Sequence, residues 1–248
     1  MNGASGSSPG SRRFWTRAQA VADADGMWSV ALDGRGVKLP GGTPLRVRSG
    51  ALADAIAQEW DAAGATVGGT FSPLDLPLTR IAGTMIERIA PNRSGAIDLL
   101  AAYADADLLS YRAGPLPDPL LAGRQAAAWG PWIDWAREHH ALDLPITTGV
   151  MPLPRDPARE RAARAVLATR GDAALAALGV AVPALGSLVL GLALADGRLD
   201  AAEATALATL DDEAQLDVWG DDPEARARLA TIARDVTDAA RFMALADA

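Results

Sequence analysis

The spacing of apolar residues changes at Ser49, and this change restricts the chain to a fold that begins with short strands and continues with helices. Before Ser49 the apolar runs are short, and tight turns such as Asp33-Gly34 separate them, which is typical of a β-meander. After Ser49 apolar residues recur every three to four positions, the repeat of an amphipathic helix. The sequence therefore predicts the α+β class. The expected strands are 28–32, 37–39 and 44–47.

The first domain is expected to span residues 14–114 and to consist of a small antiparallel sheet packed with helices. Residues 1–13 are small and polar at their start, and we expect them to form a disordered tail. The elements expected after the meander are a helix from Ser49 or Gly50 to about Gly64, an extended segment over Ser72–Thr79, a helix over Ile81–Ile89, a helix that begins at Asn92 or Ser94, and a strand over Leu108–Arg112.

The second domain, residues 115–248, is expected to be an all-α helical bundle. Its most apolar stretch, Pro183–Ala195, has thirteen residues. A membrane crossing needs about 20, so we expect a buried helix and no membrane insertion. Gly and Pro residues mark the expected interruptions. Gly130-Pro131 should kink or split its helix, and the expected breaks are an extended connector over Pro145–Pro157, Gly171, Gly179–Pro183, Asp196-Gly197 and Gly220–Pro223.

The composition excludes several kinds of chemistry. The chain has no cysteine, which rules out disulfides, thiolate metal sites and cysteine nucleophiles. Its two histidines, His139 and His140, are adjacent and would point about 100° apart on a helix, so they cannot easily share a metal ion. A phosphate-binding glycine loop does not occur. We therefore expect no cofactor.

The net charge of −8 is concentrated at one end of the chain. Residues 196–248 contain 13 acidic residues and 5 arginines, whereas residues 1–195 contain 18 residues of each sign. Such an acidic lobe favours basic protein partners and argues against binding of nucleic acid. The first residues lack the apolar core of a secretory signal, so we expect a cytoplasmic protein.

One acidic segment resembles part of a calcium site. Residues 196–203 match the second half of a calcium-binding loop, but Leu192 and Leu194 stand where the first oxygen ligands belong. We therefore interpret the segment as a turn between helices, in which Gly197 ends one helix and Asp200 and Glu203 form a capping box for the next.

A second acidic segment consists of Glu59, Trp60 and Asp61. Residues two apart on a helix do not converge, so a general acid–base pair would need a partner from elsewhere in the chain. The favoured interpretation places Trp60 in the core between two solvated acids. The alternative is a hydrolase-like enzyme whose carboxylate-based site lies between the two domains and uses Glu59, Asp61 or Asp75.

Residues 210–220 carry the most informative surface pattern. At 100° per residue, Asp212, Gln215 and Trp219 share one face within about 60° of each other. An acid, an amide and a tryptophan on one face are typical of a protein-binding hot spot. In the alternative, Trp219 packs under the first domain and Gln215 caps a loop. The stripe expected to face the bundle core consists of Leu207, Leu210, Ala214 and Val218.

Motifs in unbroken order from Phe14 to the C-terminus resemble the ATP12 family. Each motif alone is weak, whereas the ordered set is specific. The motifs are Val30–Lys38 with Pro40, Leu52–Asp61, Pro77-Leu78-Thr79 with Thr84, Asp107–Arg112, Gln125, Trp129, Pro131 and Trp135, then Ser187, Leu192–Leu194, Glu203-Ala204, Leu210–Asp212, Gln215, Trp219 and Gly220.

The resemblance implies an assembly chaperone for the F1 part of ATP synthase, as found in mitochondria and α-proteobacteria. Such a protein has an α+β domain followed by an all-α domain, holds the unassembled F1 α subunit until β subunits join it, and is not an enzyme. The functional acids of the family precede the second-domain glutamine, where the family more often has glutamate. The residues expected to bind the partner are Asp211, Asp212, Glu213, Gln215 and Trp219, and the motif residues expected to be structural are Glu59, Trp60, Asp61, Tyr111 and Arg112.

The composition, rich in Ala and Arg with a single lysine, suits a GC-rich bacterium and therefore a bacterial cytoplasmic protein. We expect a monomer. A homo-oligomeric scaffold that uses the acidic lobe remains a further alternative beside the enzyme.

Overall fold

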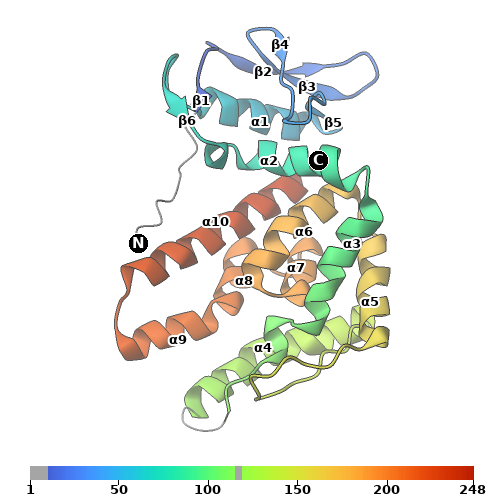
Figure 1. Cartoon of the computed structure of the whole chain (residues 1–248), viewed down its shortest axis with the longest axis vertical. Helices are drawn as coiled ribbons and strands as arrows, with labels where there is room; N and C mark the ends of the chain where they lie inside the picture. Colours follow the sequence, from blue (N-terminus) through green and yellow to red (C-terminus); the bar gives the residue numbers. More distant parts are fainter. Residues whose placement is uncertain (1–10, 115–118) are drawn as a thin grey trace, which may run out of the picture. The chain divides into compact units, whose positions relative to one another are not determined.

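The computed structural model describes residues 11–114 and 119–248, which form two compact units (Figure 1). Of the described residues, the first unit comprises those up to Glu87 together with Ala244–Ala248, and the second comprises those from Arg88 to Met243. An antiparallel sheet with helices precedes a helical region, which confirms the expected α+β class. The domain border expected at residue 114 stays a prediction, because compact packing does not show which segments fold independently.

The sheet of the first unit is built around β3 (Trp28–Leu32). This strand pairs in antiparallel fashion with β2 (Ala18–Ala22) on one side, and with β4 (Arg35–Gly36) and β5 (Arg46–Val47) on the other. Asp33 and Gly34 both have positive φ, 48° and 81°, as the tight turn from β3 to β4 requires. The hairpin prediction is confirmed, but the strand expected over residues 37–39 is wrong, because the paired residues are Arg35 and Gly36 and Lys38 makes only an isolated bridge with Pro44. The strand expected over residues 44–47 is limited to Arg46–Val47.

A second pair of strands joins β1 (Ser11–Arg12) to β6 (Thr70–Phe71). The next residue, Arg13, is buried, and its guanidinium donates hydrogen bonds to the backbone carbonyls of Trp15 and Ala63, at 3.0 and 3.2 Å. The expectation of a tail through residue 13 is therefore wrong for residues 11–13. The rest of that expected tail, residues 1–10, lies outside the described residues.

Helix α1 (Gly50–Ala62) packs on β2 and β3 through buried residues that include Leu52 and Ile56. It begins as predicted, because the Ser49 hydroxyl accepts a hydrogen bond from the Leu52 backbone NH at 3.1 Å.

The extended segment predicted over Ser72–Thr79 is wrong. It forms a short 3₁₀ helix, η1 (Pro73–Asp75), and the start of α2 (Pro77–Thr84). Each of the two helices has a proline at its first position, where the fixed φ and the missing NH are tolerated. The prolines that suggested an extended chain therefore mark helix starts.

The strand predicted over Leu108–Arg112 is also wrong. Asp107 caps a 3₁₀ helix, η4 (Leu108–Ser110), by accepting a hydrogen bond from the Leu109 NH at 3.1 Å. Only Tyr111 makes a strand-like bridge, in parallel with Thr147. A side-chain hydrogen bond to the local backbone has outweighed the strand propensity of the segment.

The second unit is a set of packed helices, as predicted for the chain after residue 115. The Asn92 side chain caps α3 by accepting from the Gly95 NH at 3.2 Å, which is one of the two predicted starts. The elements after α2 are the π-helix η2 (Met85–Ile89), α3 (Arg93–Ala101), η3 (Ala102–Asp105), η4, α4 (Pro119–His140), α5 (Pro157–Ala168), α6 (Asp172–Leu185), α7 (Leu188–Ala195), α8 (Ala201–Ala208), α9 (Leu210–Trp219) and α10 (Pro223–Ala246).

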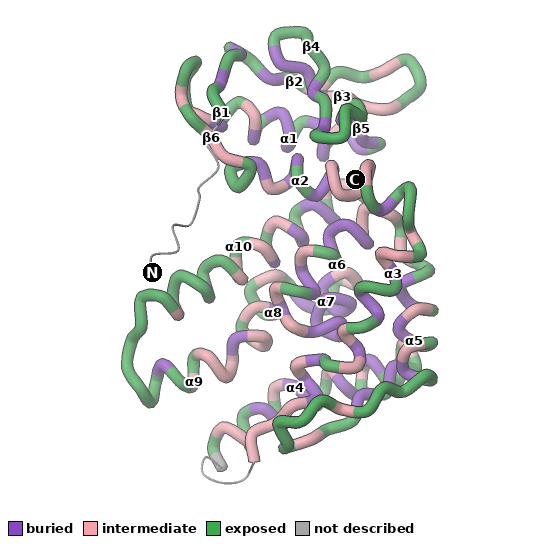
Figure 2. Tube along the Cα trace, in the orientation of Figure 1, coloured by how far each residue is buried: buried purple, intermediate pink, exposed green. Residues whose placement is uncertain are grey.

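Helix α7 is the most buried helix of this unit, and its residues Leu188–Leu194 are all buried. Figure 2 shows the buried positions along α6 and α7, whereas α9 and the first half of α10 are largely exposed or half-buried. Gly191 lets α6 approach α7 closely, because a Cβ atom there would lie 2.5 Å from Val182. This apolar stretch is the buried helix that we predicted, and no helix within residues 11–114 and 119–248 has the length and apolar character that a membrane crossing requires.

The break predicted at Gly179–Pro183 is wrong, and so is a split at Gly130-Pro131. Pro131 lies inside α4 and Pro183 inside α6, and both helices continue through them. Packing of the flanking turns outweighs the loss of one backbone hydrogen bond at each proline. Helix α6 ends instead at Gly186, whose φ is 63°. The interruptions at Gly171, Asp196-Gly197 and Gly220–Pro223 are confirmed, as is the non-helical connector between α4 and α5.

Candidate functional site

The residues expected to bind a partner lie on α9 of the second unit. The first turn of this helix holds Asp211, Asp212 and Glu213. Carboxylates at this position are favoured by the exposed backbone NH groups and the dipole of a helix N-terminus. The helix ends at Gly220, whose φ of 94° allows the chain to turn toward α10.

The three acids of the first turn have different partners. Asp211 accepts a hydrogen bond from the side-chain amide of Gln125 on α4, at 2.7 Å. Asp212 forms an ion pair with Arg228 of α10, and Glu213 forms one with Arg226, both at 2.7 Å. One acid therefore ties α9 to α4, and the other two tie it to α10.

The Gln125–Asp211 contact belongs to a buried polar network. Gln125 is 1% exposed, and its side-chain oxygen accepts a hydrogen bond from the Ala113 backbone NH at 2.6 Å. Burial raises the pKa of Asp211, against the lowering effect of the Gln125 hydrogen bond, and the neighbouring charge of Asp212 raises it further. Asp211 is therefore placed to hold α9 in position rather than to face solvent.

Arg112 completes this network, which supports the expected structural role. Its guanidinium donates to the backbone carbonyls of Leu109 and Gln125, at 2.9 and 2.7 Å, and lies 5.2 Å from the ring centre of Trp129. Burial lowers the pKa of Arg112, and the charge of Asp211 opposes that shift. The hydroxyl of Tyr111 accepts a hydrogen bond from the Leu153 NH at 3.2 Å, which holds the connector after α4.

Gln215 and Trp219 lie on the exposed side of α9. The Trp219 side chain is 86% exposed, so it is not packed in a core. Together with Asp212 and Arg228, both residues line a hollow of about 400 Å³ at the end of α9 and the start of α10. The structure thus brings Asp212, Gln215 and Trp219 together on one surface, as their helical spacing indicated.

The core stripe predicted for α9 is wrong. Val218 is 68% exposed, and Leu207, Leu210 and Ala214 are only half-buried. The buried residue of the helix is Leu216. Because the polar contacts of Asp211, Asp212 and Glu213 orient this short helix, its rotation does not follow its apolar stripe.

The acids of the first unit bind backbone groups. The Glu59 carboxylate accepts hydrogen bonds from the NH groups of Leu78 and Thr79, at 2.7 and 3.0 Å, and so caps the start of α2. Asp61 accepts from the Ala18 NH at 2.7 Å. The indole of Trp60 is half-buried and donates to the Thr79 hydroxyl at 3.1 Å. The expectation of a core Trp60 between two solvated acids is therefore wrong, because Glu59 is buried and Trp60 is only half-buried. The contacts support a structural role for all three motif residues.

Asp75, the third acid of the enzyme hypothesis, forms a capping box with Ser72 at the start of η1. The capping box predicted for Asp200 and Glu203 at the start of α8 is confirmed, with hydrogen bonds of 2.8 and 2.9 Å. At the end of α4, the His140 ring lies 3.1 Å from the carboxylate of Asp196. In the part of the chain that the structure describes, no three His, Asp or Glu residues are grouped as metal ligands would be.

The sequence patterns assigned no role to Gln125 and Asp107, but the side chains of both residues are buried and hydrogen-bonded in the structure. Gln125 links the chain before α4 to α9, and Asp107 is a fully buried carboxylate that accepts hydrogen bonds from the Leu109 and Val189 NH groups, both at 3.1 Å. Burial raises the pKa of Asp107 to about 6. Both residues lie in the motifs quoted above, but their partners are far away in the sequence.

Comparison with known proteins identifies the family. The family model described as ATP12 chaperone protein matches residues 12–137. Atp12 from Paracoccus denitrificans is 42% identical, with a TM-score of 0.83 over 95% of this chain and 98% of that one, and a point mutant of the same protein is 41% identical. Atu1473 of Agrobacterium tumefaciens, a candidate chaperone, is 32% identical, with a TM-score of 0.84 over 94% of this chain and 85% of that one. With half of the chain matched by the family model and nearly all of it aligned to Atp12, this protein belongs to the ATP12 chaperone family.

Proposed function

We propose that the protein is an assembly chaperone for ATP synthase that binds the unassembled F1 α subunit through the exposed end of α9. Membership of the ATP12 chaperone family supports the role in assembly. The observation that carries the binding site is the 86% exposure of Trp219 beside Asp212 and Gln215. An exposed indole next to charged and amide groups is the usual composition of a protein-binding hot spot.

The surroundings of Trp219 are acidic, which favours a basic surface on the client. Asp212, Asp221 and Asp222 line the hollow beside Trp219, and the whole stretch of residues 196–248 has 13 acids against 5 arginines. Long-range attraction would speed the encounter, whereas Trp219 would supply the desolvated contact. Binding should therefore weaken as salt concentration rises.

A chaperone of this kind must release its client. A subunit destined for a ring exposes apolar surface before its neighbours arrive, and such surface promotes aggregation. The small surface around Trp219 can cover part of this apolar surface with modest affinity. The β subunits, which form a larger interface with the client, then displace the chaperone. We propose that the protein acts in this way as a monomer in the bacterial cytoplasm and without catalysis.

The test is capture of purified α subunit by the immobilised protein. Trp219→Ala should reduce capture about tenfold or more, as expected for a hot-spot residue. Asp212→Lys should reduce capture and weaken its dependence on salt, because Asp212 lines the hollow beside Trp219. Leu99→Ala is the matched apolar control because Leu99 is 75% exposed on α3, and Glu138→Lys on α4 is the charge control.

Circular dichroism and thermal unfolding must show that each variant is folded, since Asp212 also pairs with Arg228. Undiminished capture by the folded variants would refute the binding site. Failure of the unchanged protein to capture α subunit would refute the proposed client.

A further inference from the structure

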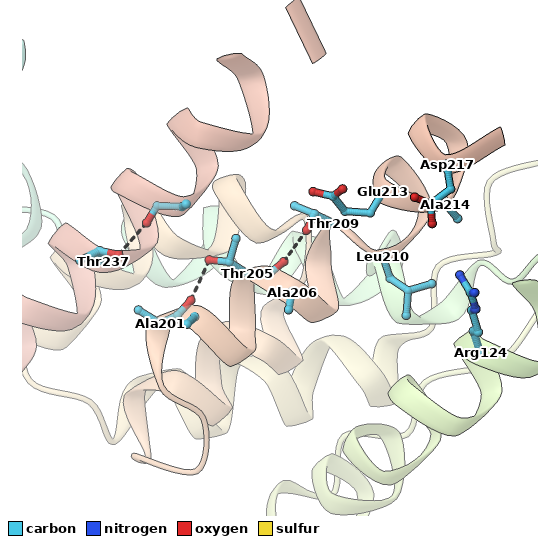
Figure 3. Close-up of a pocket in the computed structure, with 12 residues that line it drawn as sticks. Arg124, Ala201, Thr205, Ala206, Thr209, Leu210, Glu213, Ala214, Asp217 and Thr237 are labelled. Carbon is cyan, nitrogen blue, oxygen red and sulfur yellow. Dashed lines mark hydrogen bonds between the residues drawn. The ribbon is translucent and has the colours of Figure 1, made fainter. Parts of the chain in front are cut away.

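A second hollow in the helical unit lies apart from the one beside Trp219. It has a volume of about 560 Å³ and is formed by α8, α9 and α10, with Arg124 of α4 at one end (Figure 3). Its lining consists mostly of alanine and threonine side chains. They are Ala201, Ala202, Thr205, Ala206, Thr209, Ala214, Ala233 and Thr237, with Leu210, Glu213 and Asp217 from α9. We call this hollow the α8–α10 groove.

The threonines of the α8–α10 groove offer little hydrogen bonding to a partner. The hydroxyl of Thr205 donates to the Ala201 carbonyl at 2.7 Å, that of Thr209 to the Thr205 carbonyl at 2.9 Å, and that of Thr237 to the Ala233 carbonyl at 2.7 Å, as the dashed lines in Figure 3 show. With the hydroxyl hydrogens used inside their own helices, the alanine and threonine methyl groups dominate the lining. The lining of the groove is therefore mainly apolar.

This lining favours a helix over an extended strand as the occupant. An extended segment would need hydrogen-bond partners along its whole backbone, and helices, unlike the edge of a sheet, offer no row of free backbone groups to pair with it. A helix satisfies its own backbone, and small residues in the groove allow it to approach closely. Helix-in-groove binding is a common mode of peptide recognition when the helix has one apolar face.

The charge at the groove favours a basic helix. On α9, Glu213 and Asp217 lie one turn apart at the lining. Glu213 already pairs with Arg226, whereas Asp217 is exposed and forms no ion pair within residues 11–114 and 119–248. Arg124 is the one cation in the lining, and the C-terminal stretch that supplies the three helices has 13 acids against 5 arginines. The same acidity disfavours a second copy of this acidic lobe as the occupant.

We propose that the α8–α10 groove binds an amphipathic helix of the client that carries basic residues beside its apolar face. This inference rests on the proposed chaperone function and extends it, because it assigns the client a second contact on the side of α9 that faces away from the Trp219 hollow. Helix α9 then contributes to both surfaces, with Asp212 and Gln215 on one and Glu213 and Asp217 on the other.

The experiment uses a substitution that fills the α8–α10 groove and leaves the hollow beside Trp219 unchanged. Ala206 is exposed and lines the groove, so Ala206→Trp should occupy its volume while leaving the core intact. Ala227→Trp is the matched control, since Ala227 is an exposed alanine of α10 outside the lining. Asp217→Lys tests the charge. We expect Ala206→Trp to weaken capture of purified α subunit about tenfold, Asp217→Lys to weaken it at low salt, and Ala227→Trp to leave it unchanged.

A second measurement separates the groove from the identity of the client. The probe is a labelled helical peptide of about 18 residues built from Leu, Ala and Lys, and its Leu, Ala and Glu counterpart is the control. Fluorescence anisotropy should show binding of the basic peptide alone, and Ala206→Trp but not Trp219→Ala should abolish it. If the peptide behaves in this way while α subunit is not captured, the groove assignment stands and the proposed client is wrong.

Three results would overturn the inference. In the first, the folded Ala206→Trp variant captures α subunit and binds the basic peptide as well as the unchanged protein does. The acidic peptide could bind as well as the basic one. Light scattering could instead show self-association that Ala206→Trp abolishes without changing capture, in which case the groove holds a second copy of this chain.

Discussion

Asp107 provides a test of how burial and hydrogen bonding compete in this fold. Its carboxylate is 0% exposed and accepts hydrogen bonds from the NH groups of Leu109 and Val189. Those bonds, with others from Ser187 and Leu188, favour the ionised form, but burial dominates and raises the pKa from 3.8 to about 6. The shift corresponds to about 3 kcal/mol, because one pKa unit is about 1.4 kcal/mol.

The sign of the pH dependence follows from this shift. A carboxyl whose pKa is higher in the folded state contributes fully to stability below pH 3.8 and loses that contribution as pH rises through about 6. Asp107→Asn keeps the size of the side chain and removes the titration. The free energy of unfolding of the unchanged protein, minus that of the variant, should therefore fall by about 2 kcal/mol between pH 4 and pH 7, the rest of the change lying below pH 4.

The assay is urea unfolding followed by tryptophan fluorescence and circular dichroism at several pH values. Titration of the other carboxyl groups is common to both proteins and cancels in the difference. If the two compact units unfold in separate steps, the comparison uses the step of the second unit, which contains Asp107. A difference that is constant with pH would refute the raised pKa, and one that grows with pH would show that the hydrogen bonds outweigh burial.

Two further substitutions test contacts around α9. Gln125→Leu leaves the Ala113 NH and the half-buried Asp211 carboxylate without their hydrogen-bond partner. In urea unfolding this substitution should lower the free energy of unfolding by about 2–4 kcal/mol. A loss below about 0.5 kcal/mol would contradict the proposed role of the network. Gly220→Ala should lower the free energy of unfolding by about 1–2 kcal/mol in thermal or urea unfolding. The reason is backbone strain alone, because φ at this position is 94° and the added Cβ would meet no atom within 4 Å. Gly171→Ala is its control, since φ there is −70° and stability should change little.

Local signals in the sequence predicted where many helices begin and end. Ser49 and Asn92 cap helices, Asp200 and Glu203 form a capping box, and the turn at Gly220 separates α9 from α10. These predictions succeed because each depends on hydrogen bonds between residues within one turn of each other or on the allowed φ of a single residue. The α+β class follows from the same local patterns.

Predictions that depended on distant neighbours were less successful. Pro131 and Pro183 lie inside continuous helices, and the segment after Asp107 is a 3₁₀ turn rather than a strand. In each case the cost of a local irregularity is small compared with the packing and hydrogen bonding of the surrounding segments. Those partners are set by the tertiary structure, and the local sequence does not reveal them.

Some features of the candidate site could likewise be predicted from the sequence, whereas others depend on the tertiary structure. The sequence alone determined that α9 is acidic at its start and that Asp212, Gln215 and Trp219 share one face, because helical geometry places them there. Only the tertiary structure decided that Asp211 turns toward Gln125, that Leu216 rather than Val218 is buried, and that Trp219 remains exposed. A helical repeat specifies the angles between side chains around one helix, whereas the rotation of that helix against its neighbours depends on contacts with α4 and α10.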